Sequence, residues 1–128
     1  MRLSRPAVVA MQVYKIIKFD DPNAKITSGY LVGMAWKSIK PNLSRIDWQK
    51  VNTVQVPSVT DNNDPSLQGL QTALNLEAGV LQDIEQLQRD FIIIFGTKKI
   101  FKPFVIKLIL FAVILDENGV LPLQKEEK

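Results

Sequence analysis

The strongest pattern in this sequence is an apolar stripe that recurs at helical spacing between residues 64 and 91. Its leucine, isoleucine and phenylalanine side chains follow at steps of three, four and seven residues, which places them on one face of a helix. Asp64 and Pro65 begin the segment, and these residue types favour the N-cap and the first position of a helix. The pattern predicts one helix, about 40 Å long, against which the other elements pack.

Three residues depart from this pattern. Gly69 and Gly79 each weaken a helix by up to about 1 kcal/mol relative to alanine. Glu77 falls within the apolar stripe, where two interpretations stay open. Its carboxylate lies at the margin in water, or it is a buried or interfacial carboxylate whose pairing with a lysine or arginine fixes the register. A ferritin-like metal bundle would need histidines on companion helices, and the chain has none.

Charge is unevenly distributed along the chain, whose formal net charge is +3. Residues 1–60 contain nine lysines and arginines against three aspartates, whereas residues 61–90 contain six acidic residues against one arginine. Residues 91–128 contain six lysines and four acidic residues. We therefore expect the acidic segment to lie against basic segments, either within one chain or between chains.

The first half of the chain shows alternating patterns that favour strands. Apolar residues of one parity between Val9 and Phe19 predict a half-buried strand, followed by a turn at residues 20–23. Residues 26–39 are interpreted as a strand whose glycines approach another backbone, or as a short helix capped by Thr27 or Ser28. Residues 46–56 predict a short extended piece, and residues 57–63 have the composition of a linker.

The second half is dominated by apolar runs. Residues 91–95 are interpreted as a buried strand or as the buried last turn of the helix. Residues 104–115 are interpreted as a core strand, with Asn118-Gly119 as a hairpin turn and residues 120–123 as the return strand. This run has twelve residues and contains Lys107, so it is too short for a membrane span, which needs about 20. Its alternatives are a helix, an interfacial membrane anchor and a segment buried in a subunit interface.

These elements predict a single α+β domain, with one long amphipathic helix on one face of a small, mainly antiparallel sheet. Within it, residues 1–56 form a basic strand-rich half and residues 57–63 a linker. Residues 64–91 form the acidic helix, residues 92–123 the apolar strands and hairpin, and residues 124–128 a charged tail.

Composition argues against catalysis. The chain has no histidine and no cysteine, which removes the usual general base, the thiol nucleophile and most transition-metal ligands. It also lacks the glycine-rich and nucleophile motifs of common enzyme classes. We therefore expect no enzyme activity, no cofactor and no metal. No secretory signal is recognised, because the N-terminal apolar stretch is short and broken.

The expected function is that of a non-catalytic structural or assembly subunit, in a homo-oligomer or a larger complex. The basis is an excess of apolar residues over what a small sheet domain buries. The acidic flank of the helix is expected to meet a basic patch on a neighbouring subunit, and a membrane partner is not expected. The predicted interface consists of Leu70, Leu74, Glu77, Leu81, Asp83, Ile84, Glu85 and Asp90.

Two alternatives belong to other classes of protein. One is a module for nucleic acid or an anionic surface, although the sequence shows no recognised binding signature. Its basic surface would consist of Lys15, Lys18, Lys25, Lys37, Lys40, Arg45 and Lys50. The other is a small carrier of an apolar ligand, with a cavity lined by Phe101, Phe104 and Phe111.

Overall fold

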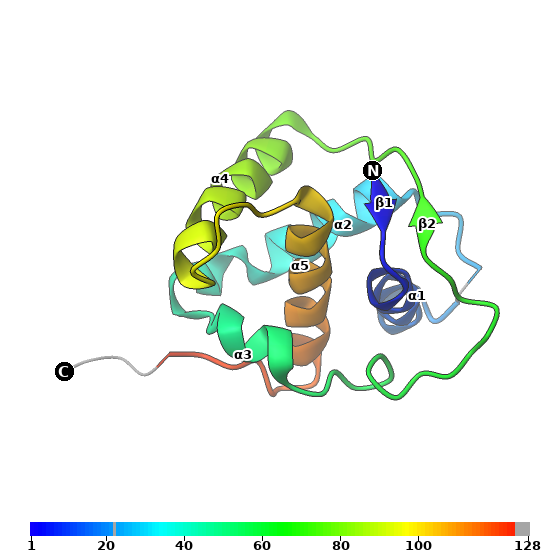
Figure 1. The fold of residues 1–128 in the computed structure, drawn as a ribbon. Helices are drawn as coiled ribbons and strands as arrows, with labels where there is room; N and C mark the ends of the chain where they lie inside the picture. Colours follow the sequence, from blue (N-terminus) through cyan, green and yellow to red (C-terminus); the bar gives the residue numbers. More distant parts are fainter. Residues whose placement is uncertain (22, 125–128) are drawn as a thin grey trace.

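The computed structural model describes residues 1–21 and 23–124, most of which are helical. Pro22 of the predicted turn and residues 125–128 of the predicted charged tail lie outside the described residues. The elements, in chain order, are β1 (Arg2–Leu3), α1 (Arg5–Phe19), α2 (Ser28–Ile39), the 3₁₀ helix η1 (Lys40–Arg45), α3 (Trp48–Thr53), β2 (Leu70–Gln71), α4 (Ala78–Ile94) and α5 (Lys102–Glu117) (Figure 1).

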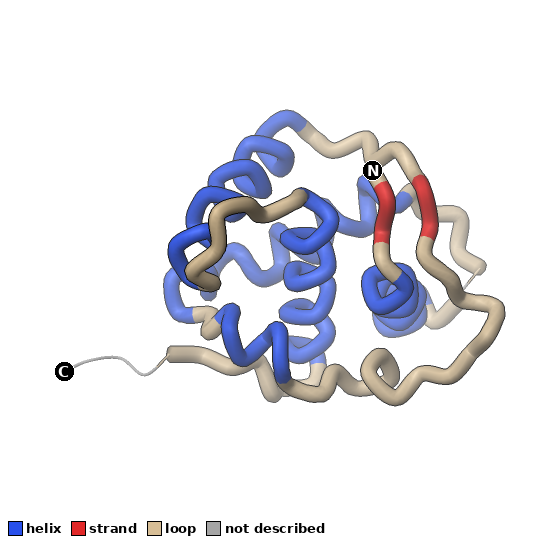
Figure 2. Tube along the Cα trace, in the orientation of Figure 1, coloured by secondary structure: helices blue, strands red, loops and turns tan. Residues whose placement is uncertain are grey.

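Helix α5 is the centre of the molecule. Every residue from Leu108 to Leu115 is buried, and eight successive helical residues point to all sides of the axis. A helix that is apolar all round must be covered all round. Helices α1, α2, α3 and α4 each contact α5, and Figures 1 and 2 show them arranged around it.

The prediction of a core strand and hairpin at residues 104–123 is wrong. A continuous apolar run fits a buried strand and a buried helix equally well, because neither has a polar face. Pro103 lies in the first turn of α5, where proline is tolerated. Gly119, with φ of 71°, ends the helix instead of forming a hairpin turn. The predicted return strand is reduced to one bridge, between Leu123 and Ile46.

The strand predicted between Val9 and Phe19 is also wrong, because it is helix α1. Residues of one parity include positions four apart, so a spacing of four supports a helix as well as a strand. The buried side chains Ala7, Ala10, Met11 and Tyr14 follow helical steps of three and four. For residues 26–39 the helical alternative is confirmed, and the Thr27 Oγ1 caps α2 by accepting a hydrogen bond from the Tyr30 N–H at 3.2 Å.

The long helix predicted from residue 64 begins only at Ala78. The preceding residues are bound to the N-terminal segment instead. The Arg5 guanidinium donates hydrogen bonds to the carbonyls of Leu67 and Asp64 at 3.0 and 3.1 Å, and β2 pairs antiparallel with β1. These tertiary contacts outweigh the modest helix propensity of a segment that contains Gly69.

The fold is therefore helical and not α+β, and within the described residues the sheet consists of β1 and β2 alone. No long helix packs on a sheet in this part of the chain. The extended piece predicted at residues 46–56 contains helix α3, which the Asp47 side chain caps by accepting from the Lys50 N–H at 3.2 Å. Residues 91–94 are the last turn of α4, and only Phe91 among them is buried.

The loop before α4 lies directly on α2. A Cβ atom on Gly29 of α2 would stand 2.2 Å from the Asn75 carbonyl oxygen, so only glycine allows this approach. The close backbone contact expected of this glycine-containing segment therefore exists, but it is made by a helix.

Helix α4 is joined to α2 by polar contacts at Asp83. The Asp83 carboxylate accepts a hydrogen bond from the Trp36 indole Nε1 at 2.9 Å and contacts the Lys40 ammonium at 3.0 Å. Both bonds favour the charged carboxylate, so the indole first and the lysine second lower the pKa of Asp83. Trp36 is only 1% exposed, so its indole N–H is removed from water and depends on the Asp83 carboxylate as its hydrogen-bond acceptor.

Gly29→Ala should destabilise the protein by about 1–3 kcal/mol, because backbone must move to admit the methyl group. Gly79 provides a matched control in α4, since nothing lies within 4 Å of the position that a Cβ atom would take there. Gly79→Ala should be neutral or stabilising by up to about 1 kcal/mol. Urea unfolding measures both variants, and equal stability of Gly29→Ala and wild type would contradict the contact with Asn75.

Asp83→Ala should lower the free energy of unfolding by about 1–2 kcal/mol at neutral pH, because the buried Trp36 N–H loses its acceptor. The folded-state pKa lies below the unfolded value, so the contribution is present above the ordinary aspartate pKa, about 3.9, and is lost as the pH falls. Unfolding of Asp83→Ala and wild type at a series of pH values should therefore converge in acid. A pH-independent difference would contradict this assignment.

Candidate functional site

The loop between α4 and α5 runs back along α4 and forms a surface of its own. The Gln88 side chain donates a hydrogen bond from Nε2 to the Ile100 carbonyl at 3.0 Å. One turn earlier on α4, Glu85 lies 3.8 Å from the Lys102 ammonium. In Figure 1 the loop leads from the C-terminus of α4 to the N-terminus of α5. These contacts hold an acid-free segment on the outside of the molecule.

Large apolar side chains on this loop and the last turn of α4 face water. Ile93 is 83% exposed and Phe101 is 61% exposed, the two highest values among the exposed large apolar residues. Lys98 and Lys99 are exposed in the same loop. We call Ile93, Lys98, Lys99, Phe101 and Lys102 the α4–α5 surface. It combines exposed apolar side chains with positive charge, and residues 91–115 contain four lysines and no acidic residue.

A cluster of aromatic rings packs together where α4 ends and α5 begins. Phe91 makes edge-on contacts with Trp48 and Phe95, with ring centroids 5.1 and 5.3 Å apart. Phe95 and Phe104 meet at 5.4 Å, which joins the end of α4 to the start of α5. Such pairs add to the stability gained from burial. The cluster therefore fixes the loop at both ends.

Two lysines lie over aromatic faces in this region. The Lys99 ammonium is 4.8 Å from the Phe101 ring centroid, and Lys107 is 4.9 Å from that of Phe104 and 5.8 Å from that of Phe111. Cation–π contact accounts for a half-buried lysine within the apolar stretch of α5. Burial lowers the pKa of Lys107. No acidic side chain of the described residues forms an ion pair with Lys107.

The apolar residues of the predicted interface do not share one helix face. Leu70 lies in β2 and is 47% exposed, whereas Leu74 lies in the loop before α4 and packs against the core. Leu81 and Ile84 do belong to α4, but Ile84 is fully buried. The structure thus separates the predicted stripe into two segments.

The acidic residues of the predicted interface have partners within the chain. Glu77 is exposed at the N-terminus of α4 and pairs with Lys37 at 3.0 Å. Asp83 and Glu85 pair with lysines as described above, and Asp90 accepts a hydrogen bond from Gln86 at 3.0 Å. The expected meeting of acidic and basic segments therefore occurs within one chain for these ion pairs. Whether these residues also contact a partner stays a prediction.

The alternative basic surface is spread over several elements. Lys37 and Lys40 of α2 and η1 pair with α4, and Lys18 of α1 pairs with Glu117. Of the others, Lys15 lies on α1, Arg45 on η1, Lys50 on α3 and Lys25 in the loop before α2. The ion pairs reduce the positive charge that this set offers to an anion.

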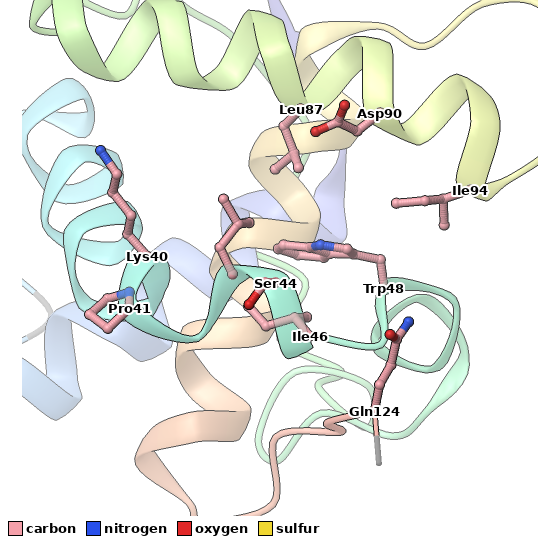
Figure 3. A pocket seen from close by; sticks show the side chains of 10 residues that line it. Lys40, Pro41, Ser44, Ile46, Trp48, Leu87, Asp90, Ile94 and Gln124 are labelled. Atoms are coloured by element: carbon pink, nitrogen blue, oxygen red, sulfur yellow. The ribbon is translucent and has the colours of Figure 1, made fainter. Parts of the chain in front are cut away.

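A pocket of about 510 Å³ lies between α4 and η1 (Figure 3). Figure 3 shows Leu87, Asp90 and Ile94 of α4 on one side and residues of η1 on the other, with the Trp48 ring between them. The pocket is lined by Lys40, Pro41, Leu43, Ser44, Ile46, Trp48, Leu87, Asp90, Ile94 and Gln124. The three phenylalanines of the predicted carrier cavity are not among them, and Phe101 faces water while Phe111 is buried.

Polar groups that line this pocket are already engaged in contacts within the chain. Its Lys40 is paired with Asp83, and the Ile94 carbonyl accepts from the Gln49 side chain at 2.6 Å. Among residues 1–21 and 23–124, no three potential metal-ligating side chains gather into a group. In the same part of the chain, no helix combines the length and apolar character that a membrane crossing requires.

The residues of the α4–α5 surface are absent from the predicted interface. The signal available in the sequence is the acid-free stretch with lysines beside Ile93 and Phe101. The interpretation of residues 91–95 as a buried strand or as the buried last turn of the helix hides the exposure of Ile93. Only the three-dimensional structure shows that the end of α4 and the following loop turn outward.

Comparisons of the chain with protein-family models, with curated proteins and with solved structures find no match. A function for the chain therefore rests on the chemistry of its own residues, and the exposed apolar and cationic side chains between α4 and α5 are its most distinctive group.

Proposed function

We propose that this chain is a non-catalytic assembly subunit that acts through protein–protein contacts, and that the α4–α5 surface makes the principal contact. The observation that carries the proposal is the exposure of Ile93 at the end of α4 and of Phe101 in the following loop, where the Lys99 ammonium lies 4.8 Å from the Phe101 ring centroid. Burying a side chain of this size contributes about 1.5–3 kcal/mol. Exposed apolar side chains grouped in one place mark interaction surfaces more often than single ones do.

The interior of the chain offers a contrast that supports the proposal. The apolar excess that the sequence analysis attributes to an interface is mostly buried around α5, so the core accounts for residues 105–115 apart from Lys107. Ile93 and Phe101 remain outside although the nearby Phe91 and Phe104 are packed with other rings. The core therefore does not need them, and a partner is what would bury them.

The arrangement resembles an interaction hot spot in its physical features. Apolar anchors lie at the centre of such a spot, and polar or charged groups surround them. Here Lys98 and Lys99 supply the charged groups, and they lie on a loop that is supported at both ends. Their charge would select an acidic partner and speed its approach.

Replacing both anchors, in Ile93→Ser with Phe101→Ser, should leave the fold intact and abolish assembly. The measurement is the apparent mass in gentle extracts of cells that produce the protein, compared with the monomer mass of 14.5 kDa. Circular dichroism and urea unfolding check the fold. A matched control is Tyr30→Ser with Leu70→Ser, which removes two exposed side chains elsewhere and should retain assembly.

Two results would contradict the proposal. One is a monomer in every extract, and the other is an assembly whose size is the same with and without the two anchors. Loss of assembly in the control pair, with the anchors intact, would move the interface to the segment of β2 and α2.

A further inference from the structure

The two ends of α5 carry surfaces of different character. The N-terminal end adjoins the α4–α5 surface, because Lys102 begins the helix. The C-terminal end lies beside the end of α1, where Lys18 forms an ion pair with Glu117. A helix of 16 residues is about 24 Å long. These two surfaces therefore cannot meet within one chain.

A pocket with mainly apolar walls lies between α1 and the loop at residues 57–58, where Asn118, the residue that follows α5, also lines it. The pocket has a volume of about 190 Å³, and we call it the α1–α5 pocket. Ile16 and Ile17 of α1 line it and are 44% and 38% exposed. Its other lining residues are Val13, Pro57, Ser58 and Asn118. An apolar side chain of a partner would find both a hollow and unburied apolar surface here.

Carboxylates lie in the chain segments next to this pocket. Asp20 and Asp21 follow the end of α1, and Asp116 and Glu117 form the last turn of α5. Against these four carboxylates the last turns of α1 bring Lys15 and Lys18, of which Lys18 is paired with Glu117. Both helices also end here, and the carbonyls of a helix C-terminus add partial negative charge.

The pKa of Tyr14 reflects the same environment. Its side chain is buried beneath this end of α1, and burial together with the nearby Glu117 charge raises the pKa of Tyr14 to about 12. The region is thus apolar and negative, whereas the α4–α5 surface is apolar and positive.

Resting on the proposed function, we infer that the partner of the α4–α5 surface is a second copy of this chain, bound head to tail. Phe101 of one copy enters the α1–α5 pocket of the next, and Lys98 and Lys99 face the carboxylates of Asp21 and Asp116. The two surfaces complement each other in shape, in apolar character and in sign of charge.

Two different patches on each copy make the contact heterologous. Such a contact leaves one patch unused at each end, so it continues into a ring or an open filament instead of stopping at a dimer. An anionic lipid surface would also attract the lysines, but it would leave the pocket and the carboxylates at the other end of α5 without a partner. The presence of the complementary pocket on the same chain favours the second copy.

Charge reversal at both patches tests this pairing with the purified chain. Lys98→Glu with Lys99→Glu should weaken self-association at least about tenfold at low salt, and Asp21→Lys with Asp116→Lys should do the same. The quadruple variant, which carries both pairs of changes, should recover association because the signs are exchanged across the interface. Sedimentation velocity measures all four proteins from about 1 μM to about 500 μM. Raising the salt from about 50 mM to about 500 mM should weaken the wild-type association.

The outcomes separate the inference from the proposed function. Wild-type protein that stays monomeric over this range overturns the inference. The proposed function fails on a different result, an assembly in cell extracts that ignores the loss of Ile93 and Phe101. Impaired association in the first pair without recovery in the quadruple variant also overturns the inference.

Flotation with vesicles of phosphatidylserine and phosphatidylcholine completes the test. The inference is overturned if the wild type is monomeric and binds vesicles, if Lys98→Glu with Lys99→Glu abolishes this binding, and if the quadruple variant does not recover it. These results would assign the lysines to lipid headgroups. Phe101→Ser is the complementary variant, and it should prevent association at every salt concentration while all lysines remain in place.

Discussion

The burial of α5 on all sides between Leu108 and Leu115 is the constraint on which the rest of the structure depends. A helix without a polar face cannot lie at the surface, so α1, α2, α3 and α4 must each supply apolar side chains to cover it. Burial of this central helix explains why a chain of 128 residues uses most of its apolar side chains for itself. It also explains why the large apolar side chains that stay exposed are informative about contacts with a partner. They remain exposed in a molecule whose core is already covered.

The polar contacts between helices have a different role, which is to position elements rather than to hold the core. The Trp36–Asp83–Lys40 contacts and the Lys37–Glu77 pair set α4 against α2. The exposed ion pair contributes little, because water screens it and its side chains lose freedom. The indole bond matters more, since Trp36 is buried. The position of α4 in turn determines where the following loop emerges and which side chains it presents.

The sequence predicted part of this structure for sound physical reasons. The α4 half of the amphipathic pattern, the Thr27 cap and the attraction between acidic and basic segments are all present. The errors share one cause. An apolar pattern in the sequence does not show which other elements of the fold cover its side chains. Residues 104–115 fit a buried strand or a buried helix, and the parity seen from Val9 to Phe19 is compatible with helical spacing. Residues 64–77 fail as a helix because Arg5 and β1 bind their backbone, a long-range contact that no local pattern contains. The same cause hides the exposure of Ile93 and Phe101.

Hydrogen exchange of backbone amides tests most directly whether α5 is the centre of the fold. If it is, the amides of Leu108 to Leu115 exchange only when the whole molecule unfolds, with a free energy equal to that of global unfolding. The amides of the loop at residues 95–101 exchange quickly, apart from those bonded to the end of α4. Exchange of the α5 amides before those of α1 and α2 would contradict the account, because the surrounding helices could not then depend on α5 for their place.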